Sequence, residues 1–189
     1  MMHTNEERVV LVDERNQVLG TSPKATVHTS ETPLHRGFSV FLFNPNGMVL
    51  MQQRSSLKKT WPLVWSNSCC GHPALDETTE AAVRRRVAFE LGITEIHNLT
   101  EALPNFRYSC VRDGVMENEI CPVWIGTIDQ DPKRNPDEVE ATYWENWKSL
   151  SKLIAKKPGN FSQWCELEVL ELNQFPQFSG LLQTLPATV

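Results

Sequence analysis

Short apolar runs separated by polar turns predict two β-hairpins in the first third of the chain. Run lengths of this kind are typical of strands, and polar residues between them are typical of turns. The second turn contains Asn46-Gly47, which favours a tight hairpin because both residues tolerate positive φ. The runs are residues 9–12 and 17–20, then 38–43 and 48–53, with an irregular stretch predicted at 21–37.

The hydrophobic period changes further along the chain and predicts a helix over residues 78–91. Its apolar face recurs at helical spacing as Val83, Val87 and Leu91. Acidic residues crowd the start, where the helix dipole favours them, and Gly92 follows the end as a C-terminal cap. Glu90 lies beside the apolar face, with Arg86 one turn earlier on the same side, so a carboxylate is expected next to the core.

The second half of the chain predicts further strands and then helices. Strands are expected at 106–111, 117–128 and 143–145, a polar acidic connection at 135–140, and helices at 148–155 and 162–174. Strands and helices in this order predict an α/β fold with a mixed central sheet and helices on both faces. The 189 residues fit a single domain, with residues 1–8 as a flexible N-terminal extension.

Composition narrows the functional classes. A net charge of −5 argues against general nucleic-acid binding, which needs a basic face. No apolar run approaches the roughly 20 residues of a membrane span, and the polar start resembles no targeting segment. An odd number of cysteines, two of them adjacent, favours a reducing compartment over a disulfide framework. We therefore expect a cytoplasmic protein, and without an amphipathic seam we expect a monomer.

Candidate metal ligands form the first group of chemically informative residues. Glu117 and Glu119 project from the same face if their segment is a strand. Together with His28, His35 and His72 they would form a mixed nitrogen and oxygen site for a divalent ion. The alternative is that the histidines are loop residues and the carboxylates face solvent, because no sequence signature links them.

Other groups also have two interpretations each. Cys70, between Cys69 and Gly71, is either an activated thiol or a small buried apolar residue. Four basic residues could clamp a diphosphate or could be solvated surface charges: Lys24, Arg54, Lys58 and Arg86. The tryptophans could form core or could stabilise a cation through their π faces.

Gly71 begins a spacing, G-x5-E-x7-R-x4-E-x-G-Ile, that is close to the Nudix box of diphosphate hydrolases. Arg86 and Phe89 stand where that box has glutamates, so two carboxylates that would gather activating magnesium ions are absent. The scaffold is retained while much of the hydrolytic equipment is missing.

Taken together, these segments resemble the type I isopentenyl-diphosphate isomerases, which share the Nudix-like fold, an α/β/α sandwich. The resemblance runs from about Val9 to the C-terminal helix. The matching segments, in chain order, are Lys24, His28 and His35, Arg54 and Lys58 before Trp61-Pro62, residues 66–73 (Ser-Asn-Ser-Cys-Cys-Gly-His-Pro), Phe106-Arg107-Tyr108, Glu117-Asn118-Glu119, and Phe161-Ser162-Gln163-Trp164.

The resemblance implies a role for each residue. Cys70 would be the catalytic thiol and Glu119 the opposing acid/base, with Tyr108 assisting Glu119 and Trp164 facing a carbocation. Metal and substrate would be held by the remaining groups. His28, His35, His72, Glu117 and Glu119 would bind Mn²⁺, Mg²⁺ or Zn²⁺; Glu90 would hold a second ion, Mg²⁺, with the substrate diphosphate; and Lys24, Arg54, Lys58 and Arg86 would contact the phosphates. Isopentenyl diphosphate or dimethylallyl diphosphate would be the small-molecule substrate.

Two alternatives stay open on sequence grounds. One is a Nudix hydrolase acting on a nucleoside diphosphate derivative, which the residues at positions 86 and 89 disfavour. The other is a non-catalytic module that binds a diphosphate, which would have no need for both Cys70 and Glu119.

Overall fold

The computed structural model describes residues 7–176, 178 and 180 of the chain, and its strands form two β-sheets. The strands are β1 (Arg8–Val12), β2 (Val18–Pro23), β3 (His35–Arg36), β4 (Phe38–Phe43), β5 (Met48–Arg54), β6 (Trp65–Ser66), β7 (Cys69–Gly71), β8 (His97–Leu103), β9 (Arg107–Arg112), β10 (Val115–Ile120), β11 (Val123–Thr127) and β12 (Val139–Asn146). The helices are α1 (Lys24–Val27), α2 (Thr79–Leu91), α3 (Trp147–Lys156) and α4 (Gln163–Leu172).

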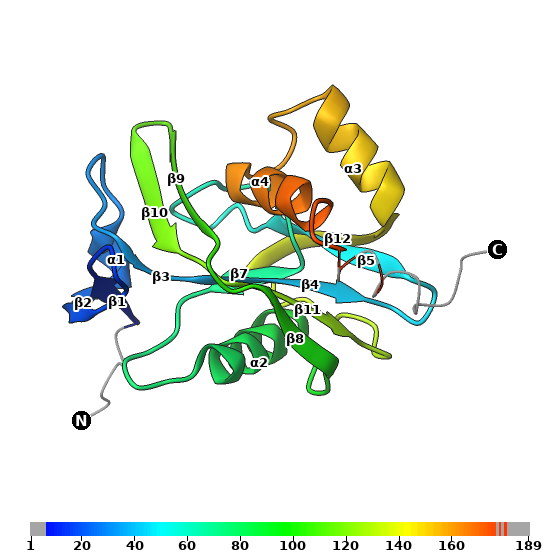
Figure 1. The fold of residues 1–189 in the computed structure, drawn as a ribbon, viewed down its shortest axis with the longest axis horizontal. Helices are drawn as coiled ribbons and strands as arrows, with labels where there is room; N and C mark the ends of the chain where they lie inside the picture. Colours follow the sequence, from blue (N-terminus) through cyan, green and yellow to red (C-terminus); the bar gives the residue numbers. More distant parts are fainter. Residues whose placement is uncertain (1–6, 177, 179, 181–189) are drawn as a thin grey trace.

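The larger sheet carries helices on both faces, as predicted. Its strand order is β12-β5-β4-β11-β8, with β6 paired to β5 and β7 to β4. It is mixed, because β4 runs parallel to β11 and antiparallel to β5 and β7. Figure 1 shows α2 on one face and α3 with α4 on the other. Successive side chains of β4 point to opposite faces of the sheet. Val40 packs in the hydrophobic core that includes residues of α2, and Phe41 packs in the hydrophobic core that includes residues of α3 and α4.

The smaller sheet joins segments that are distant in sequence. Its order is β2-β1-β3-β10-β9, so the first hairpin lies beside the β9–β10 hairpin (Figure 1). The short strand β3 makes the connection, since it pairs antiparallel with β1 and parallel with β10. This pairing places His35 directly opposite Glu119.

Helix α2 forms where the sequence predicts it. The side chain of Thr78 accepts a hydrogen bond from the backbone N–H of Ala81 and caps the N-terminus. Gly92 ends the helix in the left-handed region at φ 65°, which a glycine adopts at little cost. The predicted apolar face is fully buried, and Arg86 and Glu90 are buried with it.

Several predicted boundaries are wrong. The stretch 21–37 contains the end of β2, all of α1 and β3, because short elements leave no clear period. The strand predicted at 117–128 is two strands from different sheets, separated at Cys121 and Pro122. Strand β8 was not predicted, since its exposed first residues are polar. Of the predicted extension, residues 1–6 lie outside the described part, and Arg8 already belongs to β1.

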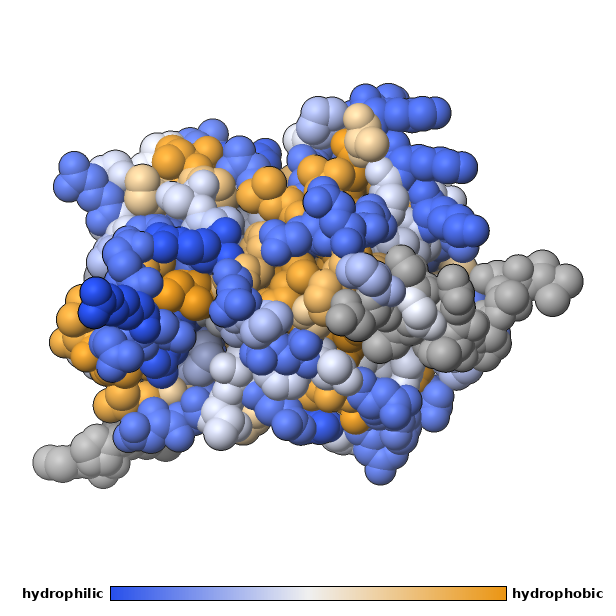
Figure 2. Space-filling model, viewed as in Figure 1, coloured by the Kyte–Doolittle hydropathy of each residue, from blue (hydrophilic) through white to orange (hydrophobic). Residues whose placement is uncertain are grey.

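The face drawn in Figure 2 is mainly polar, with apolar side chains showing between polar ones over α4. Leu167 and Leu170 of that helix are 46% and 44% exposed. Scattered exposed apolar side chains are usual on globular proteins. In the described part of the chain no helix combines the length and apolarity needed to cross a membrane.

Candidate active site

A cavity of about 330 Å³ gathers the predicted site residues from both sheets and from α4. This volume lies within the range of small-molecule sites. Cys70 reaches it from β7, Tyr108 and Glu119 from the β9–β10 hairpin, and Trp164 from the first turn of α4. All the predicted site residues line it except His35 and Glu90, which lie behind its wall.

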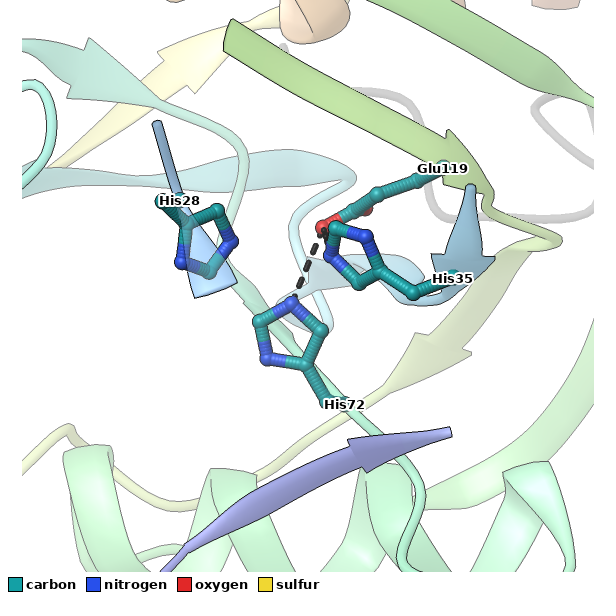
Figure 3. Close-up of side chains that lie close together, drawn as sticks. All are labelled: His28, His35, His72 and Glu119. Atoms are coloured by element: carbon teal, nitrogen blue, oxygen red, sulfur yellow. Dashed lines mark hydrogen bonds and ion pairs between the residues drawn. The ribbon is translucent and has the colours of Figure 1, made fainter. Parts of the chain in front are cut away.

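One corner of the cavity holds a cluster of imidazoles around a carboxylate, which we call the histidine corner: His28, His35, His72 and Glu119. One potential ligand atom from each lies within 4.8 Å of the others. Figure 3 shows the three rings turned toward one another beside the Glu119 carboxyl group. Oε1 of Glu119 lies 3.0 Å from Nε2 of His72 and 3.4 Å from Nε2 of His35.

Strand pairing explains why Glu119 lies at this point. It stands opposite Tyr108 on β9 and opposite His35 on β3. Gly37 makes the space for its side chain, because a Cβ there would lie 2.1 Å from Oε2 of Glu119. Nδ1 of His35 contacts the carbonyl oxygen of Pro33 at 2.9 Å, which holds the ring and turns Nε2 toward the cluster.

The histidine corner has the properties of a cation site. Nε2 of His28, Nε2 of His35 and Nδ1 of His72 are buried without a hydrogen-bond partner. Buried nitrogens rarely stay unsatisfied, and a divalent ion in the corner would accept the lone pairs of the two Nε2 atoms of His28 and His35. Burial lowers the pKa of His72 to about 4 although Glu119 opposes it, so this ring is neutral near pH 7, the form that binds metals.

Glu117 lies at the edge of the histidine corner. Its Oε2 is buried without a hydrogen-bond partner and lies 3.1 Å from Nε2 of His28. It is outside the compact group formed by the other four residues. Its role as a fifth ligand therefore remains a prediction, although the unsatisfied oxygen suits a cation.

The thiol and the carboxylate have opposite proton affinities. Burial raises the pKa of Cys70 to about 12, with Arg54 acting in the opposite direction, so the thiol keeps its proton. Burial alone would raise the pKa of Glu119, but its interactions with the His35 and His72 rings hold it well below its usual range. Burial also raises the pKa of Tyr108, whose phenol stays neutral.

Aromatic rings surround Trp164 on the cavity wall. Its indole Nε1–H donates to Oδ1 of Asn67 at 3.2 Å, and its ring lies 5.8 Å from that of Tyr108 and 5.5 Å from that of Trp61. The guanidinium of Arg54 lies 5.5 Å from the centre of the Trp164 ring. Trp164 therefore already meets a cation in this structure, as a carbocation-stabilising ring would.

The guanidinium of Arg54 is also held by backbone carbonyl groups. It donates hydrogen bonds to the carbonyl oxygens of Thr60 and Trp61. The predicted contact between Arg54 and a phosphate remains a prediction, although the residue lines the cavity.

The opposite corner, called here the cationic corner, contains Lys24, Lys58 and Arg86, each already paired with carboxylates. Nζ of Lys24 lies 2.7 Å from Glu7, and Lys58 pairs with Glu138. Arg86 lies 3.1 Å from Glu7, 2.5 Å from Glu90 and 3.2 Å from Glu138.

Glu7, Glu138 and Gly37 were not predicted as site residues. Glu138 falls in the acidic connection at 135–140, but nothing in its local pattern indicates which cations it meets. Glu7 pairs with Arg86, and Gly37 packs against Glu119, so each contacts a residue far away in the chain. Only the assembled fold shows that Glu7 and Glu138 line the cavity and that Gly37 packs against the Glu119 side chain.

The positions that distinguish this chain from a hydrolase are also resolved. Phe89 is 53% exposed, and its ring lies 5.0 Å from the guanidinium carbon of Arg86. Glu90 is 1% exposed, and its oxygens contact Arg86 and Gln52. Both oxygens of Glu90 already have partners, so a magnesium site there requires these partners to move.

Known proteins resemble this chain in sequence and in fold. The NUDIX domain family matches residues 33–165. Two relatives, from Saccharopolyspora erythraea and Kocuria rhizophila, are both named isopentenyl-diphosphate Delta-isomerase. They are 46% and 45% identical to the chain, covering 88% and 89% of it and 86% and 94% of their own lengths.

Solved structures extend the comparison to the fold alone. A crystal structure of a Deinococcus radiodurans protein matches with a TM-score of 0.68 at 24% identity, covering 87% of this chain and 98% of its own. A MutT protein from Methanosarcina mazei matches with a TM-score of 0.57 at 18% identity, covering 79% and 95%. From the family match and the close relatives, the chain belongs to the isopentenyl-diphosphate Delta-isomerases within the NUDIX family.

Proposed function

We propose that this protein interconverts isopentenyl diphosphate and dimethylallyl diphosphate. The observation that carries the proposal is that the thiol of Cys70 and the carboxyl group of Glu119 line one cavity that also has a cationic corner. A hydrolase would need neither the thiol nor the apolar wall around Trp164.

The reaction moves one double bond and leaves the composition unchanged. One proton is added to the terminal alkene carbon, which leaves a tertiary carbocation, and one proton leaves the methylene group next to it to form the new alkene. Cys70 and Glu119 are the groups that give and take these protons, because one holds a proton and the other has a vacant site. The diphosphate is unchanged throughout.

The rest of the cavity positions the substrate and its cation. Lys24, Lys58 and Arg86 would bind the diphosphate, which is the only strong handle on a five-carbon chain. The hydrocarbon would then lie against Trp164 and Tyr108, whose rings face one another across 5.8 Å. A π face in such a dry pocket stabilises a cation by about 2 kcal/mol.

A divalent ion fits the histidine corner on the evidence of its unsatisfied nitrogens. His28, His35, His72 and Glu119 would hold it, with Glu117 as the further predicted ligand. The ion would supply positive charge that fixes the Glu119 carboxylate and favours its ionised form. A magnesium ion bound with the diphosphate through Glu90 remains a prediction.

A single assay tests the proposal. Purified protein with isopentenyl diphosphate and Mg²⁺ or Mn²⁺ in deuterated water should form dimethylallyl diphosphate and incorporate deuterium, as followed by NMR. Cys70→Ala is the matched inactive variant, and Cys69→Ala, on the other face of the same strand, should stay active. Absence of isomerised product with wild-type protein, or rapid hydrolysis of ADP-ribose, would show that the proposal is wrong.

The proposal includes a cytoplasmic, monomeric enzyme that acts on a free small molecule. Light scattering during size-exclusion chromatography should give a mass near 21.6 kDa. A mass twice this value would contradict the monomer.

A further inference from the structure

Asn67 is a buried polar residue to which the proposed reaction assigns no role. It lies between β6 and β7 and is 1% exposed. The oxygen of its side-chain amide accepts hydrogen bonds from Nε1 of Trp164 at 3.2 Å and from Oγ of Ser66 at 2.7 Å. Because an indole N–H can only donate, this partner fixes which end of the amide points toward α4. The oxygen end of Asn67 therefore holds the ring that is assigned to the carbocation.

The nitrogen end of the same amide is bonded to the strand that carries the thiol. Nδ2 of Asn67 donates to the carbonyl oxygen of Cys69 at 2.8 Å and to that of Val40 at 3.3 Å. These two residues are partners in the pairing of β4 with β7. The carbonyl group of Cys69 belongs to the same peptide unit as the backbone nitrogen of Cys70. The amide therefore holds the backbone from which the thiol projects.

Ser66 extends this connection to the beginning of α4. Its Oγ lies 2.8 Å from Oγ of Ser162, the residue that caps the N-terminus of the helix. The backbone N–H of Ser162 donates to the carbonyl oxygen of Trp65 at 2.8 Å. Both serines are buried, and hydrogen bonds are stronger where water does not compete for them. The first turn of α4 and the ring of Trp164 are thus bonded to one short segment, residues 65–67.

We propose that Asn67 is a positioning residue, whose side-chain amide sets the distance between the Trp164 ring and the Cys70 thiol. The proposal rests on the proposed function, since that function assigns these two side chains to the reaction. Small errors in such distances have large effects, because a shift of about 1 Å can lower a rate by about a hundredfold. The role requires an amide, which accepts at one end and donates at the other; an ionised aspartate only accepts, and a leucine does neither.

Two single variants and their combination test the proposal by kinetics. Asn67→Ala removes the amide, whereas Trp164→Phe keeps an aromatic ring and removes its N–H donor. We expect Asn67→Ala to lower kcat by about 10- to 100-fold with KM changed less than about twofold, because the cationic corner keeps its residues. The double variant should lose less than the product of the two single losses, since Trp164→Phe has already broken the bond to Asn67. Fully multiplicative losses, or a rise in KM alone, would overturn the proposal.

Ser68→Ala is the matched control for a general loss of stability. The Ser68 hydroxyl is also buried, and it bonds to the backbone N–H of Leu42 at 2.8 Å and to the carbonyl oxygen of Leu50 at 2.6 Å. These bonds tie the same segment to β4 and β5 rather than to α4. We expect Tm to fall in both alanine variants, because each leaves buried backbone groups without a partner, but kcat to fall strongly only in Asn67→Ala. Equal losses of kcat would contradict a positioning role.

Two NMR signals test the positioning role without turnover. In a ¹H–¹⁵N spectrum the indole N–H of Trp164 reports the bond to Oδ1 of Asn67, and the backbone N–H of Cys70 reports the bond to the carbonyl group of its own peptide unit. Both signals should shift in Asn67→Ala, whereas the indole signal should keep its position in Ser68→Ala. The indole signal is identified by its loss in Trp164→Phe.

These signals separate the positioning role from the proposed function. If wild-type protein lacks isomerase activity, the proposed function fails and the two signals still decide whether Asn67 holds both groups. An unshifted indole signal in Asn67→Ala would overturn the positioning role.

Discussion

The two charged corners of the cavity differ in how fully their polar atoms are satisfied: in the described part of the chain, three ring nitrogens lack a partner in the histidine corner, against Nε of Arg86 in the cationic corner. In the histidine corner, ring nitrogens of His28, His35 and His72 are buried without partners. In the cationic corner, Lys24 and Arg86 are already bound by carboxylates. The first corner is arranged for an added cation, whereas the second is neutralised from within the chain.

This difference indicates how each corner meets its ligand. A cation entering the histidine corner would meet unpartnered nitrogens and would replace one protein contact, the hydrogen bond between His72 and Glu119. A diphosphate entering the cationic corner must replace Glu7 and Glu138, whose carboxylates resemble it in charge. We expect metal binding to raise the stability of the protein more than substrate binding does. We expect substrate binding mainly to rearrange the ion pairs of the cationic corner.

The largest expected effect comes from removing the Glu119 carboxylate, which is both a predicted metal ligand in the histidine corner and a predicted acid/base. Glu119→Gln should lower kcat by about a thousandfold, because both base and ligand are lost. Glu117→Gln removes an equal charge two residues away and should cost only about 10- to 100-fold, as a change in metal affinity would. Steady-state kinetics at saturating metal checks this, and equal losses would refute a distinct role for Glu119.

A smaller loss is expected when the same carboxylate is moved without being removed. Gly37→Ala places a methyl group 2.1 Å from Oε2 of Glu119, so the side chain must leave its position. We expect about a hundredfold lower kcat. Gly180→Ala, where a Cβ has open space, is the control. Wild-type rates for Gly37→Ala would mean that the Glu119 geometry tolerates displacement.

Metal addition tests the unsatisfied histidine corner directly. Mn²⁺ or Zn²⁺ at about 100 times its Kd should stabilise the protein by about 2.7 kcal/mol. For a chain of this size that corresponds to a rise in Tm of roughly 5–10 °C. A chelator should reverse the shift, and His35→Ala should abolish it. An equal shift in the alanine variant would place the ion elsewhere.

The smallest effect is expected in the cationic corner. Glu7→Gln removes one competitor for Lys24 and Arg86, so KM for the diphosphate substrate should fall by about two- to threefold, with kcat unchanged. The effect is modest because Glu7 is 53% exposed and screened by solvent. Glu101→Gln, an exposed acid on β8, controls for net charge. A KM that is unchanged or higher would contradict competition by Glu7.

Local rules were sufficient for several parts of the fold and the site. Helix α2 was predicted with its C-terminal cap, because Gly92 acts on its immediate neighbours, whereas the N-cap Thr78 was found only in the structure. The turn at Asn46-Gly47 was predicted for the same reason, since the backbone freedom of an Asn-Gly pair is intrinsic to those residues. The residues lining the cavity were predicted largely through resemblance of whole segments, and their individual roles remain predictions.

Tertiary structure alone decided which of these segments meet. The parallel pairing of β3 with β10 brings His35 to Glu119 across more than eighty residues, and no period in either segment encodes that partner. The ion pair between Glu7 and Arg86 likewise joins distant parts of the chain. The burial of Glu168 also depends on the fold, because the hydrophobic pattern of its helix does not distinguish it from an exposed acidic residue. Sequence determined the local elements and the chemically active side chains, because backbone propensity and side-chain chemistry belong to single residues. Burial and ion pairing belong to the whole fold, since they depend on which distant surfaces come into contact.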